Sequence, residues 1–123
     1  MNRILFISLT LLLSAFLAFG QSKKQELSAA SVTKTDTIKV PTIQCGTCRM
    51  NIEEALNSLD GFKAAKVDLK AKVVTVQYFA AKLDLGKIET AITKAGYAAN
   101  DKKADPAAYE KLDDCCKLPE DQE

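Results

Sequence analysis

The sequence predicts an α+β fold with the element order βαββαβ. Apolar and polar residues alternate in four segments, as they do in half-buried strands, and apolar residues follow a helical period in two others. The predicted strands are 37–40, 65–69, 74–78 and the short 97–99, and the predicted helices are 47–59 and 85–95. A strand, a helix and a strand make up each half. This order describes a ferredoxin-like sandwich, a four-stranded antiparallel sheet with both helices on one face.

The first half begins where Ile38 and Val40 alternate with polar residues. Pro41 follows at the end of the strand, where the loss of a backbone N–H is tolerated. The helix that comes next carries an apolar stripe made of Ile52, Ala55, Leu56 and Leu59. Gly61 ends it, because glycine accepts the left-handed conformation that closes many helices.

The second half contains a hairpin and a second amphipathic helix. Residues 70–72 form the tight connection of the hairpin, and Gly96 ends the helix. These elements predict one common core. Its predicted members are Ile38, Val40, Ile52, Leu56, Leu59, Val67, Leu69, Val74, Val76, Ile88 and Ile92.

The first twenty residues have the pattern of a secretory signal peptide. Arg3 precedes an apolar run from Ile4 to Phe19, and the small residues Ala18 and Gly20 follow the apolar core. We expect cleavage after residue 20, export to the periplasm or beyond, and no stable membrane insertion of the mature protein. The alternative is a retained anchor helix, for which the run is short against a hydrocarbon layer of ~30 Å. Residues 21–35 are polar and small, and they predict a flexible linker.

Composition excludes several functions. The chain has 17 basic and 16 acidic residues, and removal of Arg3 with the signal peptide balances them. A neutral surface gives no reason to expect nucleic acid as a partner. Histidine is absent, which excludes a Ser–His or Cys–His catalytic pair and the commonest nitrogen ligand for metals. We expect a monomeric protein that is not an enzyme.

Cys45 and Cys48 lie three positions apart in "IQCGTC", where the first strand passes into the first helix. This spacing serves metal binding, disulfide exchange or a structural bridge. Unpaired N–H groups and the helix dipole favour thiolates at a helix N-terminus. Two thiolates suit Cu(I), with Zn(II) and other thiophilic ions as competitors. Gly46 is expected to let the loop fold tightly around the ion.

Three stretches together resemble the heavy-metal-associated domain family. They are "IQCGTC", "GFKAAKVDLKAKVVTVQY" and "IETAITKAGY". The resemblance covers about residues 37–99, so we assign 36–100 to this domain. The family includes copper chaperones, periplasmic mercury-binding proteins and the N-terminal domains of metal-transporting ATPases.

The resemblance implies that Cys45 and Cys48 bind a soft ion, Cu(I) in preference to Hg(II) or Zn(II). It implies as partner a metal transporter or another metal-binding domain. It also implies that Tyr97 lies beside the metal loop and shields it. Two positions depart from the usual pattern. Ile43 replaces a Met that packs beneath the loop in the family, and the pair Gly46–Thr47 is not the usual one.

The alternative function is thiol–disulfide exchange by the same two cysteines. "CGTC" resembles the motif of thioredoxin-like oxidoreductases, and an exported protein meets oxidising conditions. That fold is larger and usually has Trp before the motif, whereas this chain has no Trp.

Residues 101–123 form an acidic tail that the family domain does not require. Asp105 and Pro106 predict the start of a short helix over 107–114, which would lead to Cys115 and Cys116. Three alternatives stay open. The tail is a solvated appendage whose cysteines are idle or joined to each other, or it folds back to add sulfur ligands, or its cysteines exchange disulfides with the first pair.

Overall fold

The computed structural model describes residues 32–122. The predicted signal peptide, residues 1–20, lies outside the described residues, as does most of the predicted linker. The principal elements are β1 (Thr33–Lys39), α1 (Gly46–Asn57), β2 (Phe62–Asp68), β3 (Val73–Phe79), α2 (Leu85–Lys94) and α3 (Pro106–Glu110). Two short 3₁₀ turns, η2 (Asp114–Cys116) and η3 (Pro119–Asp121), follow in the tail.

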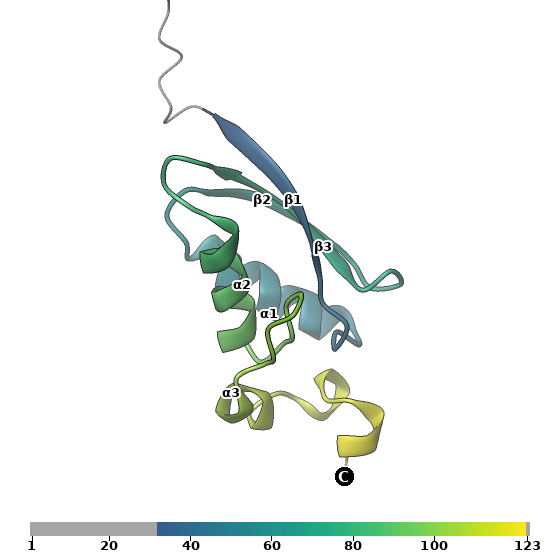
Figure 1. The fold of residues 1–123 in the computed structure, drawn as a ribbon. Helices are drawn as coiled ribbons and strands as arrows, with labels where there is room; N and C mark the ends of the chain where they lie inside the picture. The colour runs from purple at the N-terminus through teal and green to yellow at the C-terminus, as the bar shows by residue number, and fades with distance from the viewer. Residues whose placement is uncertain (1–31, 123) are drawn as a thin grey trace, which may run out of the picture.

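The three strands form one antiparallel sheet in the order β1-β3-β2. Ile38 and Val67 both lie opposite Val74, and this register keeps the apolar residues of neighbouring strands on the same face. Both long helices cover that face (Figure 1). The α+β architecture therefore agrees with the prediction.

The core lies between the sheet and the two helices. Of the predicted core, eight side chains are buried, and Leu59, Val67 and Leu69 are only partly buried. Further members are Ile43, Cys48, Tyr78, Leu83, Tyr97, Ala99 and Cys116. Because Cys48 and Cys116 are buried, the core extends to the CxxC loop at one end of the molecule.

The predicted fourth strand over 97–99 is not a strand. Ala99 makes an isolated bridge to Lys102, and Asn100 turns the chain with a left-handed φ of 51°. One backbone bond joins the N–H of Asn100 to the carbonyl of Lys39, at 2.8 Å, and the Asn100 side chain accepts from the N–H of Lys39 at 2.9 Å. The segment lies beside the end of β1, but the turn at Asn100 stops a ladder from extending.

Several predicted boundaries also change, and β2 begins at Phe62 rather than at residue 65. β1 begins at Thr33, inside the predicted linker, because Thr33 to Asp36 pair with the far end of β3. α3 ends at Glu110 rather than at residue 114. Its N-terminus is as predicted, since the Asp105 side chain accepts the Ala108 N–H and Pro106 takes the first helical position. Within residues 32–122, the helices are too short or too polar to cross a bilayer.

Candidate metal site

The core fixes the loop that carries Cys45 and Cys48. Cys45 is the extended N-cap residue of α1, and Cys48 is buried in its first turn, as predicted. Ile43 is fully buried beneath the loop, which is where the resemblance placed it. The Lys72 ammonium donates to the Ile43 carbonyl at 3.1 Å and ties the β2–β3 hairpin to the same loop.

Four sulfurs gather at this end of the molecule. Cys45 Sγ lies 3.5 Å from Cys48 Sγ, 3.2 Å from Cys115 Sγ and 3.7 Å from Cys116 Sγ. The two tail sulfurs are 4.0 Å apart. Cys45, Cys115 and Cys116 therefore all lie within 4.8 Å of one another. Of the three alternatives for the tail, this placement matches the one in which the tail folds back over the loop.

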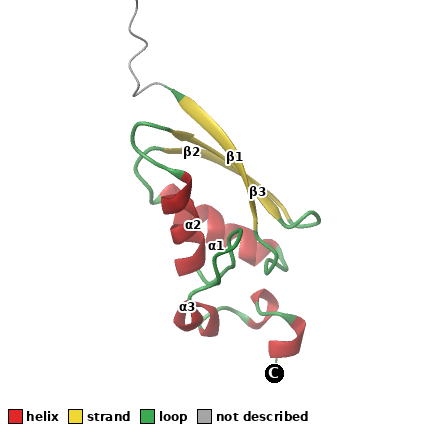
Figure 2. Ribbon diagram, in the orientation of Figure 1, coloured by secondary structure: helices red, strands yellow, loops and turns green. Residues whose placement is uncertain are grey.

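Contacts without sulfur hold the tail in this place. The N–H of Asp105 donates to the carbonyl of Thr93 at 2.9 Å, which ties the tail to the last turn of α2. The Leu112 side chain packs directly over Gly96, where a Cβ would lie 3.1 Å from its carbons. Gly96 also has a φ of 101°, so this contact depends on glycine twice. In Figure 2 the tail passes beneath the ends of α1 and α2.

Tyr109 organises the end of the tail. Its hydroxyl donates to the carboxylate of Asp121 at 2.7 Å and accepts from the N–H of Leu118 at 2.8 Å. These bonds fold the residues on either side of Cys115 and Cys116 against each other. The tail cysteines are therefore presented by an ordered segment.

The electrostatics favour ionisation at Cys45. Burial opposes the thiolate, but hydrogen bonds from the Cys48 N–H and from the thiols of Cys115, Cys48 and Cys116 outweigh it and lower the pKa of Cys45 to about 6. A second backbone donor, the N–H of Gln44, lies 3.4 Å from Cys48 Sγ. The loop thus presents N–H groups to both of its sulfurs.

The tail thiols are held in the protonated form. The hydrogen bond with Cys45 raises the pKa of the exposed Cys115, although a hydrogen bond with Thr47 acts in the opposite direction. Burial, followed by hydrogen bonding to Cys48, raises the pKa of Cys116. The Cys45 thiolate therefore faces protonated tail thiols. A thiophilic cation that binds here would take the place of the thiol protons, which are released to solvent.

Tyr97 lies beside the sulfurs, as the resemblance implied. It is fully buried, and its hydroxyl accepts from the Asn51 amide at 3.0 Å. Burial, then a hydrogen bond to Cys116, raise the pKa of Tyr97, so the phenol stays neutral and donates to that sulfur. It shields Cys116, a residue that the family pattern does not contain.

Gly46 has open space around it. A Cβ at this position would meet no atom within 4 Å, and its φ is not in the left-handed region. The role of Gly46 in letting the loop fold tightly around an ion stays a prediction. The burial of Cys116 could not be predicted from the sequence. The position of Cys116 depends on the contact between Leu112 and Gly96, which are far apart in the sequence.

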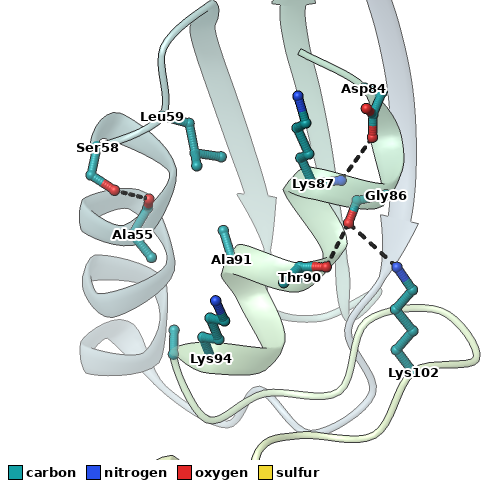
Figure 3. Close-up of a pocket in the computed structure, with 11 residues that line it drawn as sticks. Ala55, Ser58, Leu59, Asp84, Gly86, Lys87, Thr90, Ala91, Lys94 and Lys102 are labelled. Carbon is teal, nitrogen blue, oxygen red and sulfur yellow. Dashed lines mark hydrogen bonds between the residues drawn. The ribbon is translucent and has the colours of Figure 1, made fainter.

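An open groove between α1 and α2 lies apart from the sulfurs (Figure 3). Several of its polar groups already bond within their own helices: Ser58 to the Ala55 carbonyl, the Lys87 N–H to Asp84, and Thr90 to the Gly86 carbonyl. The groove offers no convergent ligand atoms, so the candidate site is the sulfur cluster.

Comparison with known proteins decides the family. The family model described as "Heavy-metal-associated domain" matches residues 37–98. The chain belongs to the heavy-metal-associated domain family. This family is a non-enzymatic metal-binding domain, in agreement with the prediction.

Individual relatives span chaperones and transport proteins. A periplasmic component of mercuric transport from Shewanella putrefaciens is 38% identical over 71 residues, covering 58% of this chain and 78% of that protein. The copper chaperone CopZ of Staphylococcus aureus is 36% identical over 62 residues, covering 50% and 91%. A solved CopZ metallochaperone matches with a TM-score of 0.53 and 33% identity over 54% of this chain and 98% of that one. The family match ends before the tail.

Proposed function

We propose that this protein is an exported carrier of a soft metal ion, which it binds through Cys45 and Cys48 and passes on by exchange of thiolate ligands. The observation that carries the proposal is the pair of sulfurs 3.5 Å apart at the N-terminus of α1. Backbone N–H groups stabilise the thiolates, and soft thiolates select thiophilic ions. The membership of the metal-binding family and the likeness to a periplasmic mercury protein support the same function.

Cu(I) is the ion that two thiolates serve best, because it accepts two sulfurs and stays open to a third from a partner. Hg(II) and Zn(II) are the alternatives. Cys45 is the more accessible of the two ligands and is the first to exchange. The partner is a metal transporter or another metal-binding domain, whose own thiolates take over the ion one at a time.

Export rests on the pattern of residues 1–20 and on the periplasmic relative. In the periplasm or outside the cell, the protein would capture the ion that its partner then accepts. Processing of the N-terminus is measured by the mass of the protein recovered from the cell envelope, which a cleaved signal shortens by twenty residues.

The test is a titration of the reduced protein under anaerobic conditions. We expect tight binding of one Cu(I) per chain and its loss in the Cys45→Ser, Cys48→Ser variant. Far-UV circular dichroism of the variant checks that it still folds. Full affinity in the double variant would remove the assignment of Cys45 and Cys48.

Thiol–disulfide exchange is the second candidate, and the observation that favours it is the lowered pKa of Cys45 among three neighbouring cysteine sulfurs. A metal carrier should reduce insulin no faster than a simple dithiol. Catalytic turnover without metal, dependent on both Cys45 and Cys48, would instead establish the redox function.

A further inference from the structure

We propose that Cys115 and Cys116 are metal ligands, which complete with Cys45 and Cys48 a site of three or four sulfurs around one ion. The proposal rests on the proposed function and deepens it, because it changes the coordination number and therefore the ions that are retained. Within residues 32–122, one group of three or more potential ligands lies close enough together to hold an ion. It consists of Cys45, Cys115 and Cys116, and Cys48 joins it only through its 3.5 Å contact with Cys45.

The distances between the sulfurs can be compared with those expected around a bound ion. With metal–sulfur bonds of ~2.3 Å, two sulfurs lie ~4.6 Å apart in linear, ~4.0 Å in trigonal and ~3.8 Å in tetrahedral coordination. The four measured contacts are 3.2, 3.5, 3.7 and 4.0 Å. The distances of 3.7 and 4.0 Å match the tetrahedral and trigonal values, and those of 3.2 and 3.5 Å are shorter. The two short contacts must lengthen to admit an ion, and linear coordination requires the sulfurs to separate further still.

Preorganisation is the second argument. Cys116 is fully buried and lies beside the buried Tyr97. Leu112 on Gly96 and the bond from Asp105 to Thr93 fix the tail without help from sulfur. Because the tail is already ordered, most of the entropy cost of bringing two more ligands to the ion is met by folding.

Charge decides which ions gain most from the tail. Each thiol that binds releases its proton to solvent. Cu(I) with two thiolates leaves one net negative charge, and a divalent ion with three thiolates leaves the same charge. The N–H groups at the start of α1 compensate that charge equally well in both cases. The added sulfurs therefore benefit a divalent thiophilic ion, such as Zn(II), more than Cu(I).

The tail also affects how the ion passes to a partner. Cys115 lies in contact with Cys45, the loop ligand through which exchange would begin. A partner thiolate must take the place of a tail sulfur before it reaches the ion. The tail would therefore retain the ion until a partner with its own thiolates displaces it.

The test is X-ray absorption spectroscopy at the zinc edge on the fully reduced, Zn(II)-loaded protein. We expect three or four sulfurs around zinc in the wild type. The Cys115→Ala, Cys116→Ala variant should show two sulfurs with oxygen or nitrogen from solvent. A matched control, Glu120→Ala, changes an exposed tail residue and should leave the sulfur count unchanged.

Chelator competition on the same proteins gives the affinities. The double alanine variant should lose on the order of 100-fold in Zn(II) affinity, because a tethered ligand acts at high effective concentration. Its Cu(I) affinity should fall by less than about 10-fold, because two thiolates suffice for that ion. Two sulfurs in the wild type, or an unchanged count and affinity in the variant, would overturn the proposal.

The outcome is distinguishable from a failure of the proposed function. Loss of the ion in the Cys45→Ser, Cys48→Ser variant, with no effect of the tail variant, would keep the carrier function and remove only the tail ligands. If the alanine variant fails to fold, the wild-type sulfur count alone still decides between two sulfurs and more.

Discussion

The two cysteine pairs sit in unlike surroundings. Cys45 and Cys48 belong to a loop that the domain core fixes from below through Ile43. Cys115 and Cys116 belong to a tail that is held on the domain by the buried Cys116, by Leu112 and by a few hydrogen bonds. One pair is part of the fold, and the other is attached to it.

The pKa values divide the pairs in the same way. The pKa of Cys45 falls to about 6, whereas those of Cys115 and Cys116 are raised. The loop thus offers a thiolate at neutral pH, and the tail offers thiols that release their protons to solvent when an ion binds. The difference shows how one domain can bring together two cysteine pairs with unlike pKa values.

The largest expected effect compares two apolar supports. Ile43→Ala should lower the free energy of unfolding of the whole domain by about 3 kcal/mol, because it leaves a cavity beneath the loop. Leu112→Ala should lower it by less than about 1 kcal/mol, because Leu112 is only partly buried and supports the tail alone. Urea unfolding measures both. Equal losses would mean that the tail is part of the cooperative core.

The next effect is local and concerns tail docking. In the reduced, metal-free protein, Leu112→Ala should raise the alkylation rate of the buried Cys116 about 10-fold, because the tail opens more often. Peptide mass spectrometry separates Cys116 from the exposed Cys115. Lys111→Ala, a truncation of the exposed neighbouring residue, is the control and should leave the rate unchanged. No difference between the two variants would show that Leu112 does not hold the tail.

A smaller effect concerns Glu89, which joins α2 to the turn that leads into the tail. The Asn100 amide and the Lys102 ammonium donate to its carboxylate at 2.7 and 2.9 Å, and these contacts lower the pKa of Glu89. A lowered native pKa stabilises the fold fully above the ordinary glutamate value of ~4.3, and that contribution is lost as the pH falls through the native value.

Glu89→Gln should therefore cost about 1 kcal/mol at pH 7, and the difference from wild type should shrink below pH 4. Urea unfolding at a series of pH values measures it. Glu54→Gln, on the exposed face of α1, should show neither effect. A Glu89→Gln difference that persists unchanged at pH 3 would mean that charge at Glu89 is not its cause.

The smallest effect expected is that of metal removal on the fold. The core between sheet and helices contains apolar side chains that need no ion. The far-UV circular dichroism of the reduced protein should therefore be the same with and without metal, unlike that of a zinc finger. A disordered spectrum in the metal-free protein would contradict the independence of the core from the ion.

The sequence predicted the elements that local patterns determine. The alternation of apolar and polar residues predicted β2 and β3. The apolar stripe with Ile52 and Leu56 predicted α1, and so placed the CxxC loop at the start of that helix. The fourth strand was wrong because a left-handed turn at Asn100, which alternation does not reveal, ends the pairing with β1.

The position of the tail could be stated only as one of three alternatives. Asp105 and Pro106 predict the start of a helix, but the neighbouring residues in the sequence do not indicate where that helix packs. The docking depends on Gly96 leaving room for Leu112, a contact between residues sixteen positions apart that only the folded chain creates. Ligand roles for all four cysteines remain predictions of chemistry and geometry together.

The most direct measurement is a proton–cadmium correlation spectrum of the reduced protein loaded with one equivalent of ¹¹³Cd(II). Each cysteine that binds cadmium gives cross-peaks from its β-protons to the single metal resonance. The account predicts cross-peaks from Cys45 and Cys48 and from at least one of Cys115 and Cys116. Cross-peaks from Cys45 and Cys48 alone would contradict the tail ligands, and the absence of cross-peaks from Cys45 and Cys48 would contradict the loop site.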